Sequence, residues 1–351
     1  MKLITDNLEY QKDITYVSNL KLNWNKLKNA NILIAGATGM VGHFLVDVLI
    51  NKSKTLSCNV FALGRNENRL KSTFSVYLKN KHFFAIKSDV NFPINIKSNR
   101  IDYVIHAASN THPVAYAKEP ITTIASNVIG TKNLLDLAVA KRAKRFLFIS
   151  SNEIYGENRN DVKSFDETYC GYIDSNTLRA GYPESKRCGE SLCQAYKEEK
   201  KLDVVVARLT RTYGPTILNT DTKVMSQFIK NALNQQDIVL KSKGAQEFSY
   251  IHVVDAVSGL LTILLKGSSG EAYNIADSKS DITLKKLANN IAEYAGVKVS
   301  FQPPSKTESK GFSVVNKALL DGNKLHKLGW KAKYNIKSGV ANTLKILKDI
   351  R

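Results

Sequence analysis

A tyrosine and a lysine four residues apart are the residues of this sequence best suited to proton chemistry. Tyr182 and Lys186 lie in the segment YPESK, where a spacing of four near a helix start places both side chains on one face. The ammonium group stabilises a phenolate and lowers the tyrosine pKa towards neutrality. The tyrosine can then accept a hydroxyl proton while hydride leaves for a nicotinamide. Pro183 disfavours a helical Tyr182 and indicates a first-turn position.

The glycines of the segment GATGMVG predict a dinucleotide site. Gly36, Gly39 and Gly42 follow an apolar β-branched run, 32–35, and overlap the start of a second apolar run, 41–50. This pattern predicts a strand, a tight turn and a buried helix. Backbone amides can approach a pyrophosphate closely at the positive end of such a helix, where larger side chains would obstruct them. Ordinary turn glycines produce the same triplet, but its place between strand and helix favours the cofactor site.

The residues at the end of the second predicted strand do not decide whether the dinucleotide is NAD or NADP. NAD enzymes usually place an acid there to bind both ribose hydroxyls, whereas this strand ends Leu63-Gly64-Arg65-Asn66. Arg65 fits the 2′-phosphate of NADP, or it is an ordinary surface arginine. We therefore expect NAD, with NADP as the alternative. Asp89, after the third predicted strand, is placed to accept a hydrogen bond from the adenine amino group, or it makes a loop turn.

Alternating strands and helices must position these residues. Such alternation predicts an α/β fold with a Rossmann-type, doubly wound parallel sheet and a smaller C-terminal substrate-binding lobe. The predicted strands after the first are CNVFALG, FFAIKSD, DYVIHAAS, RFLFISS and VVVARL, and the longest predicted helices cover about 124–141 and 184–200. We expect an N-terminal extension over 1–29, a cofactor domain over 30–213 with strands returning from about 248–276, and a lobe over 214–351.

Composition excludes several other classes of protein. With 351 residues, 43% hydrophobic and 23% charged, the chain is long enough to bury a sizeable globular core. It begins with MKLITDNLEYQKDITY, which lacks the apolar run of a secretory signal, and no later stretch approaches ~18 apolar residues. The four cysteines form no CxxC and have no histidine at zinc spacing. We expect a cytoplasmic protein with no membrane partner and no metal.

The formal net charge of +20 has two readings. Such a charge is typical of nucleic-acid binders, and a non-catalytic, basic Rossmann-like binding protein is one alternative. However, the lysines are spread along the chain without a block of five or six like charges, which favours a solvated surface. We therefore expect no nucleic-acid partner, while the positive field would attract a substrate that carries a diphosphate.

From about residue 30 to its end, the chain resembles the extended short-chain dehydrogenase/reductases. Within them it is similar to the nucleotide-sugar epimerases, dehydratases and decarboxylases. The resemblance rests on GATGMVG, DYVIHAAS, PITTIASNVIGTKNLLDLA, SSNEIYG, GYPESKRCGESLC, ARLTRTYGP and the late YNIA and LGW. The run YIDSNTLRAGYPESKR looks like the UDP-glucuronate decarboxylases, and SSNEIYG is similar to the dTDP-glucose 4,6-dehydratases.

The resemblance implies a role for each matching residue. Ser151 would bind the sugar 4-hydroxyl, Tyr182 would be the general base and Lys186 its partner on the nicotinamide ribose. Glu153 would abstract the proton α to a newly formed 4-ketone, or it is a surface loop acid. The implied cofactor-binding residues are Gly36, Thr38, Gly39, Met40, Val41, Gly42, Arg65, Asp89, Val90, Ala107, Ala108, Ser109, Asn127, Ser150, Tyr182, Lys186 and Arg208. A homodimer through helices near 127–140 and 184–200 is also implied.

The sequence departs from this pattern on the substrate side, where the candidate residues are Ser109, Asn152, Glu153, Arg179, Arg211 and Phe248. Asn152 replaces an aspartate that protonates the leaving hydroxyl in dehydratases, and an amide cannot donate a proton as an acid does. Phe248 stands where decarboxylases place an arginine on the nucleotide diphosphate. Arg211 replaces an asparagine, so it either substitutes for that arginine or indicates a different substrate. Arg179 matches a sugar-site arginine, or it pairs with a neighbouring acid.

These residues together predict an enzyme that oxidises C4 of a nucleotide-linked hexose to a 4-keto intermediate. Epimerisation, loss of water or decarboxylation would follow. Asn152 argues against dehydration and Phe248 against ordinary UDP-glucuronate decarboxylation, which favours epimerisation or another 4-keto chemistry. An NADPH-dependent reductase of a keto-sugar or another ketone is the second hypothesis, and Arg65 is the residue that favours it.

Overall fold

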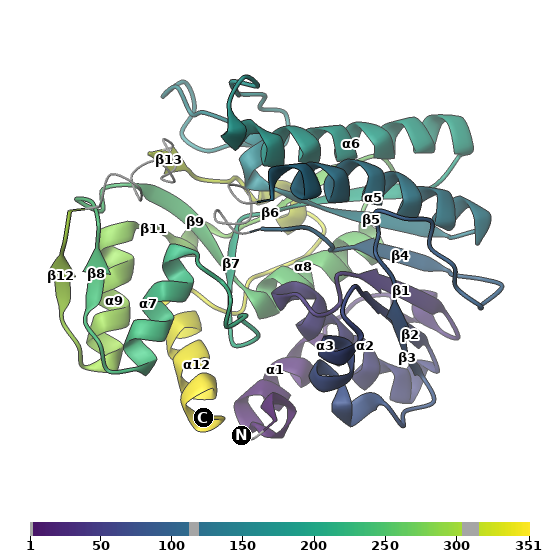
Figure 1. Ribbon diagram of the computed structural model, residues 1–351, viewed down its shortest axis with the longest axis horizontal. Helices are drawn as coiled ribbons and strands as arrows, with labels where there is room; N and C mark the ends of the chain where they lie inside the picture. The colour runs from purple at the N-terminus through teal and green to yellow at the C-terminus, as the bar shows by residue number, and fades with distance from the viewer. Residues whose placement is uncertain (1–2, 112–118, 304–315) are drawn as a thin grey trace.

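A seven-stranded parallel sheet forms the centre of the cofactor domain (Figure 1). The computed structural model describes residues 3–111, 119–303 and 316–351. The strand order is β10-β6-β5-β4-β1-β2-β3, so the order reverses between β1 and β4. Ligands of such sheets bind outside the carboxyl ends of the strands at this reversal. The strands are β1 (Asn31–Ala35), β2 (Asn59–Gly64), β3 (Phe83–Lys87), β4 (Tyr103–His106), β5 (Arg145–Ser151), β6 (Val204–Leu209) and β10 (Ala272–Ile275).

Helices cover both faces of this sheet, as a parallel sheet requires. Alternate strand residues point to opposite faces, so Ile34 and Ile149 pack towards α2 and α8, whereas Leu33 and Phe148 pack towards α5 and α6. The predicted Rossmann-type fold is therefore confirmed. The helices of the two layers are α2 (Met40–Leu56), α3 (Glu67–Thr73), α5 (Pro120–Ala140), α6 (Gly181–Lys200) and α8 (Val253–Lys266).

The smaller lobe has its own core and two small sheets. Its larger sheet is built on β9, which pairs with β7, β11 and β13, while β8 pairs with β12. We expected strands of the segment 248–276 to return to the cofactor domain. β10 does join the central sheet, but β9 belongs to the sheet of the lobe. The elements here are β7 (Arg211–Tyr213), β8 (Ile238–Leu240), β9 (Glu247–His252), β11 (Asp281–Thr283), β12 (Val299–Phe301), β13 (Lys317–Ala318), α7 (Val224–Leu233), α9 (Leu284–Ala295), α11 (Asn323–His326) and α12 (Ile336–Asp349).

The N-terminal segment before β1 packs against both parts of the molecule. Its helix α1 (Leu8–Ser18) lies on α2, where the buried Tyr10 hydroxyl donates to Asp47 at 2.5 Å. On its other side, the buried Asp13 accepts from the Lys333 ammonium and the Tyr334 hydroxyl, each at 2.6 Å. The two chain ends therefore lie close together (Figure 1). This segment ties the cofactor domain to the C-terminal part of the lobe.

Candidate active site

The predicted proton pair lies at the start of α6, next to the end of β5. Tyr182 and Lys186 are both buried, at 6% and 3% exposure. The Lys186 ammonium donates to the Ile149 carbonyl at 2.8 Å and lies 4.8 Å from the centre of the Phe148 ring. Ile149 is two residues before Ser151 on the same strand, so their side chains share a face. The structure therefore brings the lysine to the strand end that carries the predicted serine.

Burial changes the acidity of Lys186. Loss of solvation lowers the pKa of its ammonium group to about 7, and the nearby Glu190 carboxylate, one helical turn later, opposes this effect. A desolvated amine loses its proton more readily because the charged form is disfavoured in a medium of low polarity. The group is therefore able to exchange a proton near neutral pH.

Glu153 lies on the turn directly after Ser151 and contacts Arg179. The Ser151 hydroxyl accepts from the Glu153 backbone amide at 3.2 Å, which starts a short 3₁₀ helix over Asn152–Tyr155. The Arg179 guanidinium is 3.4 Å from both carboxylate oxygens of Glu153. The predicted pairing of Arg179 with an acid is thus present, and its contact with a sugar stays a prediction. Asn152 is buried in the same turn.

The glycine turn between β1 and α2 has the shape of a pyrophosphate cradle. Gly36 has a φ of +82°, and a Cβ there would lie 2.6 Å from the Ala107 carbonyl oxygen. A Cβ at Gly42 would overlap the Gly36 carbonyl oxygen. Gly39 is the N-cap of α2, which leaves the positive helix end open to an anion. These residues fit a bound dinucleotide because any larger side chain would fill the cradle or break the turn.

The other predicted cofactor residues surround this turn. Thr38, Met40 and Val41 belong to the turn and the start of α2, Ala107, Ala108 and Ser109 follow β4, and Asp89 and Val90 follow β3. The Asp89 carboxylate accepts from the Asn91 amide at 3.0 Å, so it does make a loop turn, and its adenine contact stays a prediction. Asn127 donates to Ser185 at 2.9 Å. Within the described residues, the buried Asn127 Oδ1 and Ser150 Oγ have no hydrogen-bond partner, as expected of groups that await a ligand.

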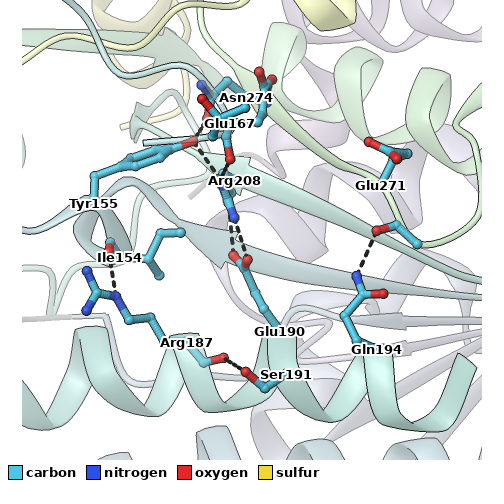
Figure 2. A network of polar contacts seen from close by, with 12 residues as sticks. Ile154, Tyr155, Glu167, Arg187, Glu190, Ser191, Gln194, Arg208, Glu271 and Asn274 are labelled. Carbon is cyan, nitrogen blue, oxygen red and sulfur yellow. Dashed lines mark hydrogen bonds and ion pairs between the residues drawn. The ribbon is translucent and has the colours of Figure 1, made fainter. Parts of the chain in front are cut away.

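Arg208 lies in a network of polar contacts (Figure 2). Its guanidinium donates twice to Glu190, at 3.1 and 2.7 Å, and also to the Tyr155 hydroxyl and the Glu167 carbonyl. The Tyr155 hydroxyl in turn donates to Asn274 at 2.7 Å. A buried charge needs such partners, and they join β6 to α6 and β10. The contacts of Arg208 therefore do not support its predicted place among the cofactor ligands.

Arg211 and Phe248, the two unusual lobe residues, contact each other. β7 pairs in parallel with β9, and the guanidinium carbon of Arg211 lies 3.6 Å from the centre of the Phe248 ring. β7 begins two residues after β6, whose last residue, Leu209, pairs with Ser151. Arg211 therefore lies only two residues beyond the carboxyl end of β6, which is paired with the end of β5 that carries Ser151.

Two further residues contact the glycine turn, and neither was predicted from the sequence. Arg69 in α3 donates to the Thr38 carbonyl at 3.2 Å, and Thr216 in the lobe donates to the Met40 carbonyl at 2.8 Å. Arg69 follows Arg65 by four residues, so a second arginine close to the strand end was visible in the sequence. Thr216 gave no signal, because its partner is far away in the sequence.

In the part of the chain that the structure describes, no group of three His, Cys, Asp or Glu side chains could hold a metal ion. The same described residues contain no helix that is both long enough and apolar enough to span a membrane.

Comparisons with known proteins agree with this geometry. Residues 32–276 match the model of the NAD dependent epimerase/dehydratase family. The chain is 31% identical over 319 residues to UDP-glucuronic acid decarboxylase 2 of Arabidopsis thaliana, covering 90% of this chain and 67% of that protein. Its fold is similar to dTDP-glucose 4,6-dehydratase from Streptomyces venezuelae, solved with NAD, at a TM-score of 0.77 and 22% identity, covering 91% and 97% of the two chains. It is also similar to UDP-glucuronic acid 4-epimerase from Bacillus cereus, solved with NAD, at a TM-score of 0.76 and 20% identity, covering 92% and 100%.

The family match covers more than half of the chain and includes the glycine turn, the proton pair and the returning strand β10. The chain belongs to the NAD dependent epimerase/dehydratase family.

Proposed function

We propose that this chain is a cytoplasmic, NAD-dependent enzyme that oxidises C4 of a hexose linked to a nucleoside diphosphate and then modifies the 4-keto sugar. The observation that carries the proposal is the Lys186–Ile149 hydrogen bond, because it brings the Lys186 ammonium to the end of the strand that carries Ser151. The glycine cradle lies at the same carboxyl edge of the sheet. The cysteines are free thiols, which suits a reducing compartment.

The residues at this edge would divide the chemistry between them. Bound NAD⁺ supplies the hydride acceptor. Ser151 orients the sugar 4-hydroxyl, and Tyr182 accepts its proton as the 4-ketone forms. The Lys186 ammonium stabilises the tyrosinate that accepts this proton. Glu153 would then remove the proton next to the ketone, which is acidic only after oxidation.

The step after oxidation is constrained by Asn152 and Arg211. Asn152 cannot protonate a leaving hydroxyl, so dehydration would need another acid. Decarboxylation of a 4-keto uronic acid needs no such acid, and the named relative is a UDP-glucuronic acid decarboxylase. The position of Arg211 over Phe248 supplies a guanidinium in the lobe, which weakens the objection to decarboxylation that Phe248 raised. Epimerisation and decarboxylation are therefore the two favoured outcomes.

The proposal predicts a 4-keto chemistry that depends on the Tyr182 hydroxyl. Nucleotide sugars are incubated with the protein and NAD⁺. Chromatography coupled to mass spectrometry then detects loss of carbon dioxide, loss of water, or a new peak of unchanged mass that indicates an isomer. Tyr182→Phe removes the proton acceptor and should lower turnover by at least ~100-fold. Tyr169→Phe, the same change in an exposed loop, should leave turnover intact. Full turnover by Tyr182→Phe would exclude the assigned base.

A second prediction concerns the pH dependence of stability. The Lys186 pKa is about 7 in the folded chain, whereas an unfolded lysine keeps its proton to about pH 10.4. Between these values the unfolded state binds more protons, so the free energy of unfolding rises with pH, by a few kcal/mol in all. Lys186→Met should abolish turnover and remove this rise, measured by urea unfolding without dinucleotide at pH 7, 8 and 9. Lys197→Met on the same helix is the control. Equal slopes for wild type and Lys186→Met would contradict the assignment.

We further propose that Arg211 binds the substrate diphosphate. An aromatic ring limits the motion of an arginine stacked on it, and the planar guanidinium matches phosphate oxygens with two parallel donors. Arg211→Met should raise KM for the nucleotide sugar roughly 10-fold or more, with a smaller change in kcat, because the contact is remote from the reacting carbon. Lys52→Met, which removes a similar contact on Trp24 in the N-terminal segment, should change neither constant. An unchanged KM in Arg211→Met would exclude this anchor.

We also propose that two copies associate through α5 and α6. These helices lie side by side on the outer face of the sheet (Figure 1), and α5 exposes Ile121, Ile124, Ile129 and Val139. Light scattering should give about twice the chain mass of 39.1 kDa. Ile129→Arg places a charge in the apolar face and should yield the monomer, whereas Tyr294→Arg on α9 should not. A monomeric wild type at micromolar concentration would contradict the proposal.

A further inference from the structure

The turn that follows β2 borders the glycine cradle. The backbone amides of Gly36 and Ala37 both donate to the Leu63 carbonyl, at 3.0 and 3.1 Å. The residues directly after Leu63 therefore lie beside the pyrophosphate turn. In dinucleotide-binding sheets, this position contacts the adenosine ribose and decides between a free 2′-hydroxyl and a 2′-phosphate.

No carboxylate of this turn is directed to a ribose. β2 ends at Gly64, and the Asn66 side chain caps α3 by accepting from the Arg69 amide at 2.9 Å. Glu67 is the first acid of the turn, and its carboxylate forms a 2.7 Å ion pair with Lys71 one turn further along α3. The acid that would accept both ribose hydroxyls of NAD is therefore missing at this place.

Positive groups occupy the turn instead. Arg69 extends from α3 to the Thr38 carbonyl of the glycine turn, so its guanidinium lies against the cradle. Arg65 directly follows the strand and is exposed. Lys87, the ladder partner of Gly64 on β3, is exposed as well. A dianionic phosphate is stabilised by such charges, and arginine matches its oxygens with a planar fork of donors.

We infer that Arg65 and Arg69 form a 2′-phosphate subsite, so that this chain binds NADP⁺ at least as tightly as the NAD⁺ of its family. The inference rests on the dinucleotide part of the proposed function and is independent of the sugar. Arg65 would contact the phosphate from the strand end, and Arg69 from the side of the glycine turn. The proton-handling residues are unaffected by this choice, because they lie at the nicotinamide end of the site.

Calorimetric titration of the full-length chain, freed of retained dinucleotide, tests this with NADP⁺ and NAD⁺ as the probes. We expect a Kd for NADP⁺ equal to or below that for NAD⁺. Arg65→Ala and Arg69→Ala should each weaken NADP⁺ about 10-fold or more and NAD⁺ less than about 3-fold, because each removes a charged hydrogen bond to phosphate. Arg65→Asp should tighten NAD⁺ and weaken NADP⁺. Lys201→Ala, an exposed cation at the carboxyl end of α6, should alter neither affinity.

The inference is overturned if NADP⁺ binds more weakly than NAD⁺, or if the two alanine variants weaken both dinucleotides equally. Equal weakening would mean that the Arg69–Thr38 bond only supports the turn. Tight NAD⁺ binding with weak NADP⁺ binding leaves the proposed sugar oxidation intact. Conversely, the predicted binding pattern together with no reaction on any nucleotide sugar would overturn the proposed function and keep the subsite.

Discussion

The hydrogen bond from the Lys186 ammonium to the Ile149 carbonyl is the contact on which the rest of the site depends. It joins the first turns of α6 to β5, and the burial of the amine at this contact lowers its pKa to about 7. Glu190 opposes this loss of charge, but both oxygens of its carboxylate accept hydrogen bonds from the Arg208 guanidinium (Figure 2). The network beneath α6 therefore limits how far Glu190 can restore the charge on Lys186, and it couples proton handling to the packing of β6 and β10.

Local sequence patterns were sufficient to predict the strands and the helix that carry the proton-handling residues. β5 and β6 are buried on both faces, so each appears as a continuous apolar run that ends at the sheet edge. The spacing of Tyr182 and Lys186 determines a shared helical face wherever the helix begins. The helix does begin at Gly181, three residues before the predicted range, because Pro183 is accepted in a first turn. Glycine spacing was informative because a Cβ at Gly36 meets backbone that cannot move away.

Contacts between distant segments could not be read in the same way. The partners of Arg208 come from α6 and from the segment before it, and the family resemblance, which implied a cofactor contact for Arg208, gave no sign of them. β9 has the composition of a strand in either sheet, and only its pairing with β7 places Phe248 under Arg211. Asp13 and Lys333 are separated by 320 residues, so the polar N-terminal segment gave no sign that it binds the lobe. Each of these contacts depends on tertiary register, which no local periodicity encodes.

Asn152 departs from the family pattern in the turn after Ser151, but the other departures fall at positions that would bind phosphate groups. In the lobe, a phenylalanine stands where an arginine was expected, but the neighbouring strand places a guanidinium on its ring, so a positive charge is retained near that point. At the end of β2, an arginine stands where an acid was expected, and Arg69 adds a second positive charge. Ser151, Tyr182 and Lys186 show no such change. Oxidation of a hydroxyl needs the proton pair in a fixed geometry, whereas anion recognition needs only a correctly placed charge, which different strands can supply. On the proposed function, the chain would therefore keep the proton pair of its family and change the contacts that select its ligands.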